Sequence, residues 1–401
     1  MSLRISLLFL FIVSSILAHT QQDSLQNAPL NMALSIVNNK DGHPLTVGVY
    51  AQIDYNQGIG NSFRENGSLD VHRLVNFLGY RFNDKTHFVT EIEFEHVNEV
   101  MVEQAFLNYA IRPSLSVRAG LMLIPMGIVN EYHEPTTFNG VERPNLDAKI
   151  IPTTWREIGV GLFGRVNEAS LSYQVYVVNG FLSYNGNGVL RGDDGLRKGR
   201  QKGAQSIISH PNFSAKVDHY GIRGLKMGIA GYAGRSQSTL YGQIDLQDEA
   251  GRMQADSSTV GVLMTGFDFR YRNKGFMSRG QIIYSKLSDT RAYNAYTGSD
   301  LGSEMLGYYF ELGYDLLTLF TKKQEVKELI LFSRYENYDT HHQVAEGIQR
   351  NNAFNRTDIT TGLTFRVAKG AVFKGDYQYF TNRSSSNDPL GQLNLGIGVW
   401  F

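Results

Sequence analysis

The sequence predicts an all-β fold, a single antiparallel β-barrel of about 16 strands that crosses a membrane and has one loop folded inward. Three observations favour it. From Leu45 to the C-terminus, segments of about ten residues alternate apolar and polar side chains. After residue 18 the chain has no long uninterrupted apolar stretch. The final strand, from Leu393 to Phe401, keeps this alternation up to the last residue.

The C-terminal strand indicates where the apolar face of the sheet lies. A soluble chain seldom ends on an exposed aromatic residue inside an alternating strand, because an open apolar edge invites aggregation. A strand that closes a barrel in lipid has no such edge. We expect Phe401 and Val399 to face lipid, and Gln392, Asn394 and Trp400 to face inward. This last strand should pair with the strand that begins near Thr46.

The N-terminus has the pattern of a secretory signal. Arg4 precedes the apolar run Leu7–Val13, and small residues end at Ala18. The run is too short to span a bilayer as a helix. We predict a signal peptide over 1–18, a periplasmic N-terminal segment over 19–44 and an outer-membrane β-barrel over 45–401.

The strands are clearest where every second residue is apolar. Examples are Val47 to Tyr55, Leu306 to Tyr314 and Ile359 to Val367. Short turns join some neighbours, at 112–114 and 368–370, and long polar loops join others, at 56–68, 181–210, 236–258, 287–303 and 337–356. Short turns at one end and long loops at the other are typical of outer-membrane barrels.

Composition narrows the function classes. The chain has 38 basic and 38 acidic residues, so nucleic acid is not an expected partner. Without cysteine there are no disulfides or thiolate metal sites. No motif singles out a catalytic nucleophile, so we predict no enzyme and no cofactor. Glu131, His133 and Glu134 are metal-ligand types, but their spacing matches no strong site, and packing of the loop is the favoured interpretation.

Residues 124–158 interrupt the alternation. Five of the nine prolines lie in this stretch or at its edge, namely Pro113, Pro125, Pro135, Pro144 and Pro152. A long irregular segment in a compact domain is usually functional. We therefore predict that 124–158 is a constriction loop inside the barrel, with Arg118, Glu131, Glu142, Arg143 and Arg156 at the constriction. In the alternative interpretation, Arg143 and Arg156 pair with Glu142 and Glu157 and only pin the loop to the wall.

The polar phase of the strands predicts the lumen lining. Basic candidates are Arg118, Arg165, Arg270, Arg279, Arg334, Arg366 and Lys374, and acidic ones are Asp268, Glu336, Asp376 and the row Glu91, Glu93 and Glu95. Among them Arg165, Arg366 and Lys374 join the constriction candidates. Such charges can instead solvate a wide lumen or pair across strands.

Several motifs carry a resemblance to a known family. The run from Gly120 to Gly127, Glu142-Arg143-Pro144, Arg156 to Gly161 and Tyr173 to Gly180 resemble the phosphate-selective porins O and P, in their Bacteroidetes-type branch. The resemblance implies a 16-stranded channel, commonly a homotrimer, with its third loop folded inward. The acidic row opposes a purely anion-attracting lumen, so phosphate selectivity is not carried over with the fold.

The function expected is that of an outer-membrane porin for passive diffusion of small hydrophilic solutes or ions, with anions as the candidate preference. The final strand resembles the closing strand of bacterial outer-membrane barrels, and this resemblance implies that the barrel assembly machinery reads the terminal Phe401. The other expected partners are outer-membrane lipid and small solutes or inorganic anions. The alternative is a non-conducting barrel subunit of a larger outer-membrane complex.

Overall fold

The computed structural model describes residues 43–60, 66–245, 247–320, 327–385 and 389–401. The predicted signal peptide and most of the predicted periplasmic segment lie outside them. The barrel strands are β1 (Leu45–Ile59), β2 (Ser68–Asn83), β3 (Thr86–Glu95), β4 (Glu99–Arg112), β5 (Leu115–Leu123), β6 (Arg156–Val166), β7 (Leu171–Val178), β9 (Asn212–Ile222), β10 (Leu225–Arg235), β12 (Gly261–Asn273), β13 (Phe276–Ser288), β14 (Glu304–Asp315), β15 (Glu328–Gln343), β16 (Asn355–Ala368), β17 (Ala371–Asn382) and β18 (Leu390–Trp400).

These 16 strands form a closed barrel in which each is antiparallel to both neighbours, as the alternation predicted. β18 closes the cylinder against β1, with Tyr50 opposite Trp400 and Ile59 opposite Gly391. The last residue takes part in this closure. The amide of Val49 donates to the carbonyl oxygen of Phe401 at 2.8 Å, and the amide of Phe401 donates to that of Val49 at 3.0 Å.

The two faces of the wall differ in chemistry. On β14, Tyr308, Phe310 and Leu312 point outward and are 39–46% exposed, while Glu311 between them is 2% exposed. The same alternation runs through β16, β17 and β18. An apolar outer face and a polar inner face suit a wall between lipid and a lumen.

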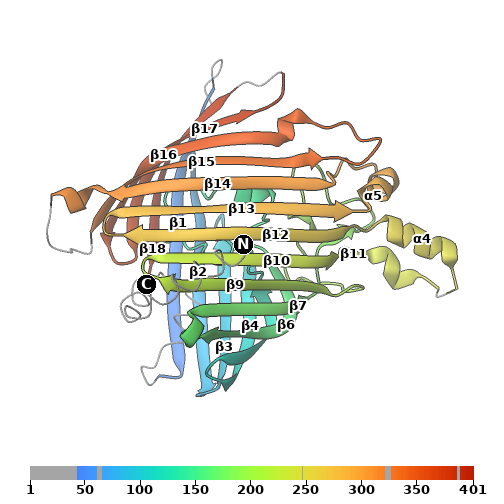
Figure 1. The fold of residues 1–401 in the computed structure, drawn as a ribbon, viewed down its shortest axis with the longest axis horizontal. Coiled ribbons are helices and arrows are strands. Elements are labelled where there is room, and N and C mark those ends of the chain that lie inside the picture. Colours follow the sequence, from blue (N-terminus) through green and yellow to red (C-terminus); the bar gives the residue numbers. More distant parts are fainter. Residues whose placement is uncertain (1–42, 61–65, 246, 321–326, 386–388) are drawn as a thin grey trace, which may run out of the picture.

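The two ends of the barrel differ in the length of their connections. Turns such as those at 84–85, 113–114 and 369–370 lie at the end that carries the C-terminus, which we call the short-turn end. The other end, the long-loop end, carries helices α4 (Glu249–Ser257) and α5 (Thr290–Thr297) and the small sheet of β8 (Leu182–Tyr184) and β11 (Gln237–Ser238). Figure 1 shows both helices at the end opposite the C-terminus.

Two details differ from the sequence-based expectations. The alternation did not indicate helices, yet α4 and α5 form within long loops, because each is only two turns long and buries few side chains. Two predicted loops also begin later, since β1 continues to Ile59 and β15 to Gln343. Among the described residues, no helix has the length and apolar character needed to cross a membrane.

Candidate functional site: the loop inside the lumen

Residues 124–155 join β5 to β6 and lie inside the barrel. Most of their side chains are buried, including Ile124, Met126, Ile151 and Trp155, each with no exposed surface. A short helix, α3 (Leu146–Lys149), is the one regular element within this segment as described. We call residues 124–155 the lumen loop.

Asn130 ties the two ends of the lumen loop together. Its side-chain amide donates to the carbonyl oxygens of Ile124 at 2.7 Å and Trp155 at 3.0 Å, and its Oδ1 accepts from the Trp155 amide at 2.7 Å. The Trp155 ring stacks on Phe181 and packs against Tyr232, both with ring centroids 4.7 Å away. The loop therefore enters and leaves the lumen at one fixed point.

Towards β3 and β4, the loop is anchored through His133. Its Nε2 lies 3.3 Å from an oxygen of Glu91 and 3.3 Å from an oxygen of Glu103. Arg156 lies 3.8 Å from Glu103, and Arg73 lies 4.0 Å from Glu93. All of these side chains are buried. Each acidic side chain therefore needs a cationic partner, and His133, Arg156 and Arg73 are those partners.

The cluster of Glu91, Glu103 and His133 has the ligand types of a metal site, with ligand atoms within 4.8 Å of one another. Charge balance favours an imidazolium instead. His133 lies 3.3 Å from both Glu91 and Glu103, so a protonated imidazole is a cationic partner for each of them, and Arg156 is a second one for Glu103. A divalent ion in place of the proton would add an uncompensated charge in a buried place. We therefore interpret the cluster as an anchor of the loop.

Towards β9 and β12, the anchor is Lys216. Its ammonium group donates to the carbonyl oxygen of Gly127 at 2.9 Å and to Glu131 at 2.8 Å, and lies 3.1 Å from Asp268. Lys216 is 2% exposed. Glu131 also accepts a hydrogen bond from Gln174 on β7 at 2.6 Å.

Towards β13, β14 and β15, side chains of the wall bind polar groups of the loop. Gln281 donates to Asp147 at 2.8 Å and accepts from the amide of Ile128 at 2.9 Å. Asn139 donates to Glu311 at 3.0 Å. The amide of Leu146 donates to Glu336 at 3.0 Å, and Arg334 lies 3.3 Å from the same glutamate.

Towards β17, β18 and β1, the contacts are made by residues 141 and 142. The amide of Val141 donates to Asp376 at 2.6 Å, and Asn56 donates to Glu142 at 2.8 Å. Gln52 donates to the carbonyl oxygen of Val141 at 3.4 Å.

The lumen loop fills the cross-section that it spans. Each barrel strand places an inward-facing side chain with 4% or less exposed surface along its inner wall. These residues are Gln52, Val75, Glu91, Gln104, Met122, Glu157, Tyr176, Lys216, Ala230, Met264, Gln281, Tyr309, Arg334, Thr360, Asp376 and Asn394. The loop is thus packed against the wall around the whole circumference, and passage through the barrel requires part of it to move.

The short-turn side of the loop meets a basic surface. Arg366 donates to the carbonyl oxygen of Thr136 at 2.7 Å, and Lys374 lies over the ring of Phe138 at 3.9 Å. Arg270 lies over the ring of Tyr132 at 4.0 Å. On the wall, Arg270 stands directly opposite Lys226 on one side and Arg279 on the other. These three partly buried side chains, which we call the basic row, lie on the short-turn side of the loop.

The residues predicted from sequence fall into three groups. Glu131, Arg156, Lys374, Glu91 and Glu93 lie between the loop and the wall, and Arg366 contacts the loop from the short-turn side. Glu142 and Arg143 lie at its half-exposed long-loop side, where Arg143 donates to the carbonyl oxygen of His133 at 3.4 Å. Arg118 packs between the rings of Phe106 and Phe163, Arg165 is exposed, and Glu95 is half-exposed beside His96.

Arg156 pairs with Glu103 of the wall, while Glu157 accepts hydrogen bonds from the Trp155 indole and the Gly180 amide. Glu142 binds Asn56. The predicted pinning partners Glu142 and Glu157 are thus engaged by other groups.

Sequence reasoning missed Lys216 and Glu103. Lys216 stands on an alternating strand and has the same phase as the charged candidates, so the phase rule could have found it. Glu103 escaped because a register shift in the pairing of β3 with β4 changes which residues of β4 point inward.

At the long-loop end, the loop over 179–211 is joined to α3. Lys149 and Lys198 both pair with Asp194. Partial burial raises the pKa of Asp194, but the hydrogen bonds from the two lysines outweigh burial and hold that pKa below its ordinary value.

Solved structures show what this fold resembles. They include an anion-selective porin from Comamonas acidovorans (TM-score 0.56, 12% identity, 89% of this chain and 100% of that chain). Two more are OmpT of Vibrio cholerae and OmpF of Salmonella typhi in complex with daunomycin, each with a TM-score of 0.51 and 11% identity, over 90% of this chain and 99% of theirs. The chain thus has the β-barrel fold of outer-membrane porins.

No family model matches the sequence. An uncharacterized protein of Aquifex aeolicus (strain VF5) is 31% identical over 345 residues, which span 83% of this chain and 75% of that protein. The chain belongs to the same family as this Aquifex aeolicus protein.

Proposed function

We propose that the protein is a porin of a bacterial outer membrane through which small hydrophilic solutes diffuse without covalent chemistry. The support comes from the barrel itself, because an apolar exterior suits contact with lipid and a charged interior suits contact with water or polar solutes. The lumen loop sets the width of the passage. Because the loop fills the lumen in this structure, conduction depends on its displacement.

We also propose a preference for anions, and the basic row carries this proposal. Like charges directly opposite each other on neighbouring strands destabilise a sheet. Lys226 and Arg279 are partly neutralised, by Asp218 at 2.9 Å and Glu311 at 2.9 Å, whereas Arg270 between them contacts the neutral ring of Tyr132. A surplus positive charge at an entrance raises the local concentration of anions. The anion-selective porin of Comamonas acidovorans shares the barrel fold.

We further propose that the protein is related to the phosphate-selective porins O and P. It rests on residues 104–180. The buried glutamates near His133 are paired with cations and therefore do not repel anions as an uncompensated row would. Assembly as a homotrimer and insertion by the barrel assembly machinery belong to the same proposal.

Reconstitution of the purified protein in planar bilayers tests the function. We expect stepwise conductance and, in a KCl gradient, a reversal potential on the anion side. A filled lumen would also suit a non-conducting barrel within a larger complex. Complete absence of steps, with stoichiometric copurification of other envelope proteins, would favour that alternative and contradict the channel.

A further inference from the structure

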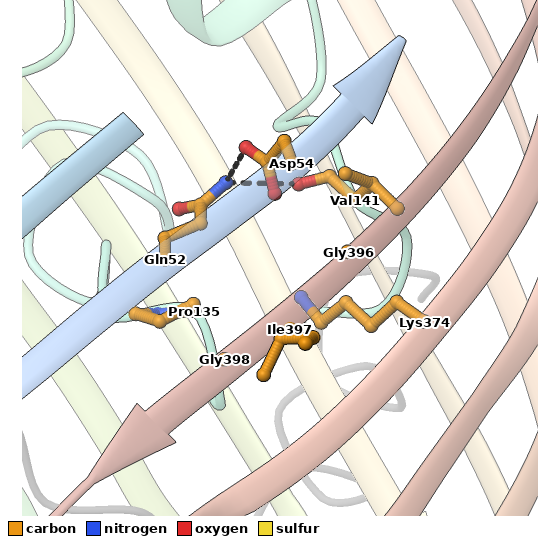
Figure 2. Close-up of a pocket in the computed structure, with 8 residues that line it drawn as sticks. All are labelled: Gln52, Asp54, Pro135, Val141, Lys374, Gly396, Ile397 and Gly398. Atoms are coloured by element: carbon orange, nitrogen blue, oxygen red, sulfur yellow. Dashed lines mark hydrogen bonds between the residues drawn. The ribbon is translucent and has the colours of Figure 1, made fainter. Parts of the chain in front are cut away.

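Two different groups of residues hold the lumen loop. Residues 131–147 bind side chains of the barrel wall, on β1, β3, β9, β13 and β15 among other strands. Figure 2 shows one of these bonds, in which Gln52 donates to the carbonyl oxygen of Val141. In the described part of the chain, residues 148–154 form no hydrogen bond or ion pair with a barrel strand. This last part of the loop is therefore held by another element.

A segment of the external loop over 179–211 holds residues 148–154. Each hydrogen bond or ion pair that they form outside the lumen loop, within the described ranges, goes to residues 191–200, which we call the strap. Lys149 pairs with Asp194 of the strap. A Cβ atom at Gly195 would lie 2.9 Å from the carbonyl oxygen of Lys149, so the strap backbone packs directly against the end of α3.

Two arginines of the strap bind the backbone of this part of the loop. Arg197 donates to the carbonyl oxygens of Ala148 at 3.4 Å and Thr153 at 2.9 Å. Arg200 donates to the same Thr153 oxygen at 2.9 Å and to that of Thr154 at 3.3 Å. Hydrogen bonds from charged donors are stronger than those between neutral groups. Loss of both guanidinium groups would leave the carbonyl oxygens of two buried residues, Thr153 and Thr154, without these partners.

The strap is supported by other external groups and not by strand pairing. The amide of Gly192 donates to Asp300, in the loop that follows α5, at 2.9 Å. Arg356 of β16 donates to the carbonyl oxygen of Asp193 at 3.2 Å. Across the described chain, no barrel strand pairs with the strap, so the strap can be displaced while the barrel stays closed.

We propose that the strap controls the lumen loop: in place, it keeps residues 148–154 in the lumen, and its displacement frees them and lets solutes pass. This inference rests on the proposed channel function. The strap belongs to the long-loop end, so residues 148–154 cannot move that way before it does. After its displacement, only their polar contacts within the lumen loop remain among those described, whereas residues 131–147 stay bound to the wall through pairs such as His133 with Glu91.

Two double variants separate the strap from the general effect of positive charge. Arg197→Met with Arg200→Met removes the donors to residues 148–154 but keeps the apolar parts of both side chains. Arg191→Met with Lys202→Met is the matched control, because it removes the same charge from two exposed residues of the same external loop. An effect of charge alone would appear in both double variants, and an effect of the strap only in the first.

Cysteine labelling measures the displacement independently of conductance, because the chain has no cysteine of its own. Thr153→Cys places a thiol at a 4% exposed position beneath the strap, and a methanethiosulfonate reagent would be added to the folded barrel in detergent. We expect this thiol to react about tenfold faster or more in the Arg197→Met, Arg200→Met background, since labelling of a buried thiol follows the population of the open form. The control background, and Val129→Cys at another buried position of the loop, should show no such increase. If Thr153→Cys does not fold, Ile150→Cys, at a fully buried position, replaces it.

Recordings in planar bilayers then test whether the strap limits conduction. The Arg197→Met, Arg200→Met barrel should be open for a fraction of the time about tenfold larger than that of the wild type and the control. Unchanged labelling in this folded variant would show that the strap does not hold residues 148–154. Faster labelling with unchanged conductance would show that solutes pass without its displacement, and either result overturns the inference. A wild type and variants that all lack conductance would instead remove the proposed function, and with it the role of the strap in passage.

Discussion

Arg270 on β12 stands directly opposite Arg279 on β13, and both side chains face the lumen. Two guanidinium groups at adjacent positions repel each other, and Lys226 extends the same row on β10. The ring of Tyr132, from the lumen loop, lies against the Arg270 guanidinium group, and this cation–π contact offsets part of the repulsion. The anion preference that we propose offers a reason for this repulsion at the entrance.

The charge of the basic row should be measurable as ion selectivity. Arg270→Gln removes its central charge, and we expect a lower anion-to-cation permeability ratio, with a larger effect at low salt because screening is weaker there. Reversal potentials in a KCl gradient would measure it. Lys274→Gln, in the exposed turn after β12, is the matched control and should leave the ratio unchanged. An equal change of the permeability ratio in both variants would contradict a role of the basic row in ion selectivity.

His133 should hold the loop against β3 and β4. In His133→Gln, Glu91 and Glu103 lose the cation that joins them, and breaking a buried ion pair in this way costs about 3 kcal/mol or more. We expect a lower urea midpoint for the barrel in phospholipid vesicles, measured by tryptophan fluorescence in a Trp400→Phe background that leaves the loop residue Trp155 as the one tryptophan. We also expect more frequent transitions to a larger conductance. His342→Gln, in half-buried surroundings on β15, is the control. If His133→Gln has the urea midpoint and the conductance transitions of the wild type, His133 does not anchor the loop.

Lys216 should contribute more to the unfolding free energy of the barrel than Lys226, another lysine that contacts the loop. Lys216→Met leaves Glu131 and Asp268 without their common partner in a buried place, with an expected loss of about 3–5 kcal/mol of unfolding free energy. Lys226→Met removes a partly exposed lysine side chain and should cost about 1 kcal/mol or less. Urea titrations of the two variants would compare them, and equal losses would show that Lys216 is not an anchor.

Replacing Phe401 should affect insertion of the barrel into the outer membrane but not the stability of the folded barrel. The backbone of Phe401 completes the pairing with Val49, whereas the residue as a whole is 79% exposed. Phe401→Ala should therefore leave the urea midpoint of the refolded barrel nearly unchanged but lower the amount of protein inserted in the outer membrane of living cells. Phe373→Ala, at another exposed aromatic position of the lipid face, should not lower insertion. Equal insertion of both variants would remove the role of the terminal ring as a signal.

The sequence was sufficient for the barrel, because alternation has a fixed phase that Phe401 and Tyr308 both reveal. The chemistry of the lumen was harder to predict. The inward phase identified Lys374 and Glu91, but the partner of each depends on how the loop lies across the barrel, which no local pattern encodes. Glu103 illustrates a second reason, since the irregular register beside it changes the phase.

The most direct test of the central claim, a porin whose lumen loop fills and limits the passage, compares conductance with and without that loop. Replacing residues 131–149 with a short Gly-Ser linker keeps Asn130 and Trp155, which tie the loop ends together. Single-channel recordings in planar bilayers should then show small, intermittent steps for the wild type and larger, lasting steps for the variant. Equal conductance of the two folded barrels, or none in either, would contradict the account.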